Sequence, residues 1–144
     1  MSASTPSIVA GIPAVNFTLY HRIRFSVGDP AALLEVDDGR GGTRRILIIR
    51  DIEMDRARRS ARADAVHCPR DFAPAGGLSG DRETATAQAA AECLRRHGAT
   101  RVTADRTLAL SFVSALREAG IEVDYDAAMG VEERRHKDEQ EIEW

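Results

Sequence analysis

Hydrophobic and polar side chains alternate over residues 16–25. The hydrophobic ones occupy four odd-numbered positions, Phe17, Leu19, Ile23 and Phe25. A period of two places these side chains on one face of an extended chain, so the pattern predicts a β-strand. The preceding residues 1–15 are small and polar, and we expect them to form a loose lead-in to the domain.

Two apolar runs follow, at residues 31–36 and 45–49, and each has the length of a strand. The segment between them, residues 37–42, contains three glycines. A short glycine-rich connection between two apolar runs is typical of a β-hairpin. We therefore expect the two runs to pair as antiparallel strands near the start of the domain.

The rest of the chain predicts helices that alternate with short strands. Three helix–strand pairs follow the hairpin, at residues 53–63 and 65–68, 82–97 and 101–104, and 107–119 and 121–125. Asp81 is placed to cap the second helix, while Gly98 and Gly120 are placed to end the second and third. Helices alternating with strands build a layered α/β domain. The sequence thus predicts a layered α/β domain with a mixed, mostly parallel sheet, an opening β-hairpin and alternating helices.

Residues 138–141 form a capping box, which marks the start of a helix. Only three residues follow it, whereas an isolated helix needs roughly 12–15 residues to be stable. We therefore expect the natural chain to continue, with residues 131–144 beginning a connector helix to a further domain.

Composition excludes several function classes. The formal net charge is −3, and the arginine-rich residues 40–70 contain no aromatic side chain, whereas single-stranded nucleic-acid sites combine cations with aromatic rings. We expect no nucleic-acid partner, and we interpret this stretch and the acidic residues 118–144 as solvated helix faces. No apolar run approaches the roughly 20 residues of a membrane span, so no membrane association is expected. Two cysteines form no disulfide framework, which favours the cytoplasm.

Two histidine–cysteine pairs are candidate metal ligands. His67 adjoins Cys68, and Cys93 and His97 lie four residues apart on one predicted helix. Zinc sites usually show tighter paired spacings such as C-x-x-C or H-E-x-x-H, and the sequence has neither. We interpret the thiols as buried and the histidines as surface residues, and predict no metal site.

Phosphate-binding and nucleophile motifs are also missing from the sequence. Residues 39–42 join two strands rather than a strand and a helix, which excludes a phosphate loop. Residues 76–80 precede a helix but lack the fingerprint glycines and a lysine, so we interpret them as a flexible loop. Ser111 and Ser114 lie within a predicted helix, outside any G-x-S-x-G turn. The motifs alone therefore predict no catalytic residue.

Five residues near the end of the chain fit one spaced pattern: Arg134, Lys137, Asp138, Glu141 and Ile142. The pattern resembles R-x-x-K-[DS]-x-x-E-[IL], which opens the helix leading into the metallopeptidase domain of the creatinase, prolidase and aminopeptidase P family. Residues 55–58 resemble the family's D/E-x-x-R-A-R helix, and 102–105 and 116–121 match its later strand and helix-to-strand steps. The resemblance covers residues 16–144, with 16–130 as the family's N-terminal domain.

The resemblance implies a division of labour. The family's C-terminal domain carries two Asp, one His and two Glu that hold two divalent metals, manganese or cobalt, and the metals activate a water that attacks the scissile amide. Its N-terminal domain caps the active site and contributes to a homodimer. We therefore expect this chain to be the non-catalytic N-terminal domain of an Xaa-Pro dipeptidase or aminopeptidase, inactive alone and holding no cofactor itself.

The resemblance also implies where substrate is met. Family members have Y-L-T-G-F in the first strand, and residues 21–25 keep only Phe25. The end of that strand lies toward the active site in relatives, so His21, Arg22 and Arg24 are the expected substrate-edge residues, whose cations can meet a carboxylate.

Two other functions compete with this interpretation. One is a free-standing α/β module that binds a small anion or a protein partner, with Ile142 and Trp144 docked on their own domain. The other is a small independent hydrolase, which is the weakest because the sequence offers no nucleophile–base pair.

Overall fold

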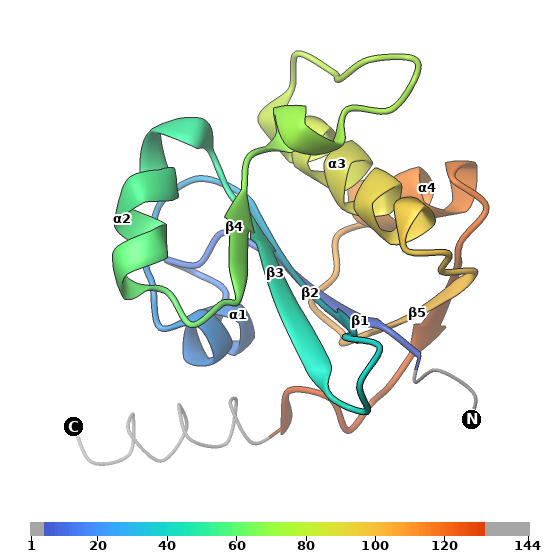
Figure 1. Cartoon of the computed structure of the whole chain (residues 1–144), viewed down its shortest axis with the longest axis horizontal. Coiled ribbons are helices and arrows are strands. Elements are labelled where there is room, and N and C mark those ends of the chain that lie inside the picture. Colours follow the sequence, from blue (N-terminus) through green and yellow to red (C-terminus); the bar gives the residue numbers. More distant parts are fainter. Residues whose placement is uncertain (1–4, 132–144) are drawn as a thin grey trace.

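The computed structural model describes residues 5–131. The elements in chain order are β1 (Ser7–Gly11), α1 (Phe17–Ile23), β2 (Ala31–Asp37), β3 (Thr43–Ile48), the 3₁₀ turn η1 (Asp51–Glu53), α2 (Met54–Ser60), β4 (Ala65–His67), the 3₁₀ turn η2 (Pro69–Phe72), α3 (Arg82–Arg96), β5 (Arg101–Ala104), α4 (Leu110–Glu118) and β6 (Glu122–Tyr125). The strands form one six-stranded sheet in the order β4-β3-β2-β1-β5-β6. Helices α1 and α2 lie on one side of the sheet, and α3 and α4 lie on the other (Figure 1). The predicted layered α/β fold is confirmed.

Strand direction decides where the loops gather. The pairs β3–β4, β1–β5 and β5–β6 are parallel, whereas β2 is antiparallel to both β1 and β3. Five strands therefore point one way and β2 alone points the other, so the sheet is mixed as predicted. We call the side where those five strands end the carboxyl edge. It is formed by residues 12–16, 27–30, 49–53, 68–81, 105–109 and 126–131.

Two apolar cores form because successive side chains of a strand point to opposite faces of the sheet. In β1, Ile8 packs into the core under α3 and α4, and its neighbour Val9 packs into the core under α1 and α2. Leu34 and Leu33 of β2 divide in the same way, and all four side chains are at most 1% exposed. The central strands are therefore covered on both faces.

The predicted strand at residues 16–25 is wrong. The chain forms helix α1 there, capped by the Asn16 side chain, which accepts a hydrogen bond from the Leu19 backbone N–H at 3.1 Å. Leu19 and Ile23 are four residues apart, so a helix brings both onto one face, and both are fully buried. The alternation that favoured a strand included Phe17, which is only partly buried.

The predicted lead-in is also wrong at residues 7–11, because these residues form β1, which lies between β2 and β5 within the sheet. Ile8, Val9 and Ala10 are all buried. Gly11 ends the strand.

Most of the other predicted elements are confirmed. The hairpin forms between β2 and β3, and Asp38 closes its turn by accepting hydrogen bonds from the Arg40 and Gly42 backbone N–H groups. Asp81 caps α3 through the Thr84 N–H at 2.9 Å. Helix α4 begins at Leu110, three residues later than predicted. No helix within residues 5–131 is long and apolar enough to cross a bilayer. The predicted capping box at 138–141 lies outside the described residues.

Candidate functional site

Within residues 5–131, the large hydrophobic side chains that stay exposed lie at the carboxyl edge or directly beside it. They are Val15, Ile52, Leu110 and Tyr125, with exposed fractions of 77%, 66%, 83% and 62%. The first three follow β1, β3 and β5, and Tyr125 ends β6. Contiguous exposed apolar patches mark interaction sites, and these four side chains are gathered toward one edge of the sheet. This edge is therefore the candidate interaction surface of the domain.

A side-chain network fixes the two central loops of that edge. Asn16 Nδ2 donates to the Ala10 carbonyl at 3.2 Å and to Thr107 Oγ1 at 3.0 Å. Thr107 Oγ1 in turn lies 2.9 Å from Oδ1 of Asp105, which is only 3% exposed. The network ties the loop after β1, which carries Val15, to the loop after β5, which leads to Leu110.

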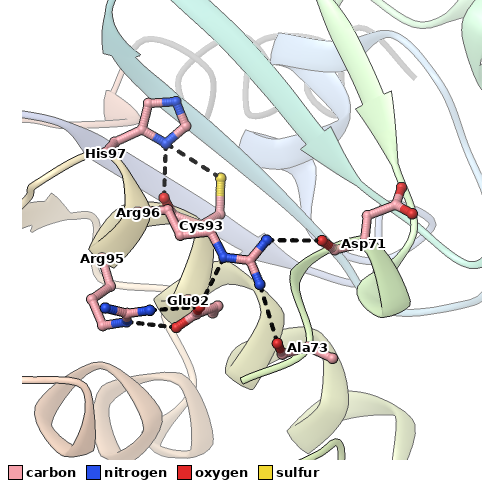
Figure 2. Close-up of polar contacts among 7 residues, drawn as sticks. All are labelled: Asp71, Ala73, Glu92, Cys93, Arg95, Arg96 and His97. Atoms are coloured by element: carbon pink, nitrogen blue, oxygen red, sulfur yellow. Dashed lines mark hydrogen bonds and ion pairs between the residues drawn. The ribbon is translucent and has the colours of Figure 1, made fainter. Parts of the chain in front are cut away.

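A second cluster joins α3 to the segment after β4 (Figure 2). The carboxylate of Glu92 accepts hydrogen bonds from Arg95 Nε at 2.7 Å and from Arg96 Nε at 2.8 Å. The terminal nitrogens of Arg96 donate to the main-chain carbonyls of Asp71, at 3.1 Å, and Ala73, at 3.2 Å. The hydrogen bonds from Arg95 and then Arg96 lower the pKa of Glu92 to about 2. Glu92 is thus a carboxylate at neutral pH and holds the guanidinium that anchors η2.

Both candidate histidine–cysteine pairs take part in local structure. His67 Nδ1 lies 3.0 Å from Asp71 Oδ2, and its ring meets the Phe72 ring edge-on at 5.0 Å. His97 Nδ1 lies 2.8 Å from the Cys93 carbonyl and 3.8 Å from its Sγ. Burial raises the pKa of the Cys93 thiol to about 12, so this sulfur is neither a thiolate ligand nor a nucleophile at neutral pH.

A metal centre would need more ligands than either pair offers. Within residues 5–131, no three or more His, Cys, Asp or Glu side chains gather so that they could hold a metal ion. A pair of metals of the kind implied by the resemblance does not fit this part of the chain.

The expected substrate-edge residues belong to α1 and its C-cap rather than to a strand. Arg22 Nη1 lies 3.4 Å from Oε1 of Glu35, and Arg24 Nη2 lies 3.2 Å from Nδ1 of His21. Glu35 pairs across the sheet with Ser7, the first residue of β1. Arg22 therefore reaches toward the amino end of β1, away from the carboxyl edge. Contact of His21, Arg22 and Arg24 with substrate stays a prediction.

Comparison with known proteins finds solved structures that share this fold. A chain described as an Xaa-Pro aminopeptidase from Streptococcus pyogenes superposes with a TM-score of 0.60 at 16% identity, over 90% of this chain and 84% of that one. An Xaa-Pro dipeptidase from Bacillus anthracis gives 0.61 at 16% identity, over 87% of this chain. A prolidase from Pyrococcus furiosus gives 0.54 at 15% identity, over 83% of this chain.

This is the fold of Xaa-Pro peptidase structures. The fold that the resemblance implied is confirmed. The superposed region makes up only 29% of the dipeptidase chain and 28% of the prolidase chain, so most of each of those chains has no counterpart here. No family model matches the sequence, and no curated protein matches it.

Proposed function

We propose that this chain is the non-catalytic N-terminal domain of a metal-dependent Xaa-Pro dipeptidase or aminopeptidase. The observation that carries the proposal is the similarity to a dipeptidase and a prolidase whose chains are more than three times as long as the superposed region. The larger part of such an enzyme would hold the two divalent metals, manganese or cobalt. Residues 16–130 would form the domain, extended by β1, and residues 131–144 would begin the connector to the catalytic part.

The carboxyl edge supports a docking role within that enzyme. Val15, Ile52, Leu110 and Tyr125 would be covered when the edge packs against the catalytic domain. The end of α1 that carries His21, Arg22 and Arg24 would face the mouth of the active site, which the domain would cap. Burying one such side chain contributes roughly 1.5–3 kcal/mol, which makes the edge a strong candidate for the contact. The whole enzyme would be a cytoplasmic homodimer. The free thiols of Cys68 and Cys93 are compatible with a reducing compartment.

The first test is the mass of the native gene product in its own cells. The proposal expects a mass far above the 15.7 kDa of this chain, together with manganese- or cobalt-dependent cleavage of an Xaa-Pro dipeptide. The 144-residue chain alone should cleave nothing. A native mass near 15.7 kDa would overturn the proposal and favour a free-standing binding module, an alternative supported by the arginine-lined pocket described below.

The docking surface is tested separately in the long product. Leu110→Ser should weaken association of the domain with the catalytic part, measured as faster exchange of backbone amides at the carboxyl edge. Arg40→Ser changes an exposed residue of the β2–β3 turn, at the opposite edge, and should leave exchange unchanged. Equal behaviour of the two variants would exclude the carboxyl edge as the contact.

The substrate-edge role of His21, Arg22 and Arg24 remains part of the proposal. Replacement of Arg24 by Gln should raise KM for a dipeptide with a free carboxylate and leave kcat unchanged. Arg40→Gln is the matched control, because it removes a guanidinium that has no proposed role. An unchanged KM in the Arg24 variant would remove Arg24 from the site.

A further inference from the structure

A pocket with a volume of about 200 Å³ opens at the carboxyl edge. It lies between the ends of β3 and β4, the segment leading into β2, and the first two turns of α3. Ligands of open α/β sheets bind outside the carboxyl ends of strands, so the pocket has the position of a ligand site. None of the substrate-edge residues expected from the sequence lines it.

The charged side chains that line the pocket leave one cation in excess. They are Arg50, Arg70, Arg82, Asp29 and Asp51. Asp29 is shared by two arginines: its Oδ1 lies 2.9 Å from Arg82 Nη1, and its Oδ2 lies 3.7 Å from Arg50 Nη1. Asp51 pairs with Arg70 at 3.4 Å. Three guanidiniums against two carboxylates suit a ligand with a single negative charge.

Among the three arginines that line the pocket, only Arg50 makes no hydrogen bond to an aspartate within residues 5–131. Its only ionic contact in the part of the chain described here is the one to Asp29, whose 3.7 Å exceeds a hydrogen bond. Its side chain lines the pocket and is 36% exposed, so a ligand in the pocket can reach its N–H donors. A guanidinium in this state matches a carboxylate, which accepts two parallel N–H donors.

The remaining wall of the pocket is largely apolar. Pro30, Cys68, Pro69 and Ala85 contribute it, and Cys68 carries a free, buried thiol. Apolar walls add affinity for a hydrocarbon group but none for inorganic phosphate. The carboxylates of Asp29 and Asp51 repel multiply charged anions. A volume of this size is also small for a nucleotide.

We propose that this pocket binds a small aliphatic monocarboxylate. The carboxylate lies on the guanidinium of Arg50, and the hydrocarbon part packs against Pro30, Cys68, Pro69 and Ala85. The Glu92–Arg96 cluster anchors η2, which carries Pro69 and Arg70, and so keeps this wall in place. The assignment does not rest on the peptidase proposal, since it concerns only residues of this chain.

The experiment is a titration of the 144-residue chain followed by ¹H–¹⁵N NMR. Isovalerate should shift the backbone amides of Arg50, Cys68 and Ala85 in a saturable way. Isovaleramide, which has the same shape without the charge, should shift none of them. Equal shifts with the amide, or tighter binding of inorganic phosphate at the same amides, would overturn the assignment.

Variants separate the two halves of the pocket. Arg50→Gln should weaken isovalerate binding at least about tenfold, and Ala85→Leu should abolish it by filling the apolar part while leaving every arginine in place. Arg40→Gln removes a guanidinium from the β2–β3 turn at the opposite edge and should leave the affinity unchanged. Unchanged affinity in both pocket variants, with their spectra otherwise like the parent's, would refute the proposal.

Discussion

Glu92 and Arg96 lie one turn apart on α3, and their ion pair positions a segment that neither belongs to. Oε2 of Glu92 is 2.8 Å from Nε of Arg96, which leaves the two terminal nitrogens of that guanidinium to donate to the carbonyls of Asp71 and Ala73. The Glu92 side chain is 8% exposed, so its charge acts in a poorly hydrated place. The carboxylate of Glu92 therefore holds η2, which forms one wall of the pocket, in place against α3.

Glu92→Gln should lower the free energy of unfolding by about 2 kcal/mol at pH 7, because charge-assisted hydrogen bonds to two arginines are lost. The folded-state pKa of Glu92 is about 2, below its ordinary value of 4.5, so its stabilising contribution is complete above pH 4.5 and disappears as the pH falls toward 2. The difference between variant and parent should shrink in the same range. Urea unfolding followed by circular dichroism at pH 7 and pH 3 measures it, and equal differences at both values would contradict the assignment.

Arg96→Gln should expose the segment after β4 to proteolysis, since its two carbonyl contacts are lost. Arg95→Gln is the matched control: Arg95 binds Glu92 at 2.7 Å but does not reach the segment. Limited digestion followed by mass spectrometry should show faster cleavage within residues 70–80 only in the Arg96 variant. Equal cleavage in both would mean that the guanidinium of Arg96 does not anchor the segment.

Asn16→Ala should cost about 2 kcal/mol of stability, because the side chain both caps α1 and donates to Ala10 and Thr107. Asn16→Ser keeps a capping oxygen but loses the two donated bonds, so it should cost about half as much. Urea unfolding of the two variants measures how much stability comes from the helix cap and how much from the two donated hydrogen bonds. If serine restored full stability, the link between the loops after β1 and β5 would contribute nothing.

Gly11→Ala should destabilise the domain by about 2 kcal/mol. Gly11 has a φ of 155°, and a Cβ there would lie 2.7 Å from Nδ2 of Asn16, which two hydrogen bonds hold in place. The cost should therefore fall when Asn16 is also replaced by Ala, because the obstructing atom is gone. A double-mutant cycle measures this coupling, and strictly additive costs would show that the backbone angle alone requires glycine.

The two cysteines should differ in reactivity by at least about tenfold. Cys93 is fully buried, and its pKa of about 12 leaves on the order of one thiolate in ten thousand molecules at pH 8. Cys68 lies on the wall of the pocket. Iodoacetamide at pH 8, read by peptide mapping, should modify Cys68 first in the native protein and both cysteines alike in denaturant. Early modification of Cys93 would contradict the packing around α3.

Sequence reasoning succeeded where a short segment decides its own structure. The hairpin depends on Asp38 and the glycines beside it, and α3 depends on Asp81 at its start and Gly98 at its end. These are contacts within a few residues, and the residue types alone indicate them. The alternation of helices and strands along the chain predicted the layered α/β fold class for the same reason, and the family resemblance agreed with it.

Two predictions were wrong, the strand at residues 16–25 and the lead-in at residues 7–11. The elements that form there, α1 and β1, depend on tertiary packing. Leu19 and Ile23 fit a helix face as well as an alternating strand, and only the apolar core beneath the sheet selects the helix. Asn16 was the available signal, as a residue type that favours a helix N-cap. Ile8 and Val9 of β1 formed a run too short to be distinguished from a tail without its partners β2 and β5.

The carboxyl-edge pocket could not be predicted from the sequence, because residues far apart in the chain form it. Arg50 and Arg82 meet at Asp29 from positions 21 and 53 residues away along the chain. No local spacing encodes such a meeting, because it follows from the order in which the strands are arranged. The reversed direction of β2 is what brings Asp29 to the same edge as the end of β3.

The place of β1 in the sheet also determines the order in which the chain can safely fold during translation. One side of β1 pairs with β2, but the other side waits for β5, where Thr103 N–H donates to the Pro6 carbonyl. Until residue 104 has left the ribosome, the nascent chain carries an unpaired strand edge flanked by apolar side chains. Such edges recruit other chains. A chain that ends before Arg101 would therefore have four strands with an unpaired edge at β1, and we expect it to aggregate.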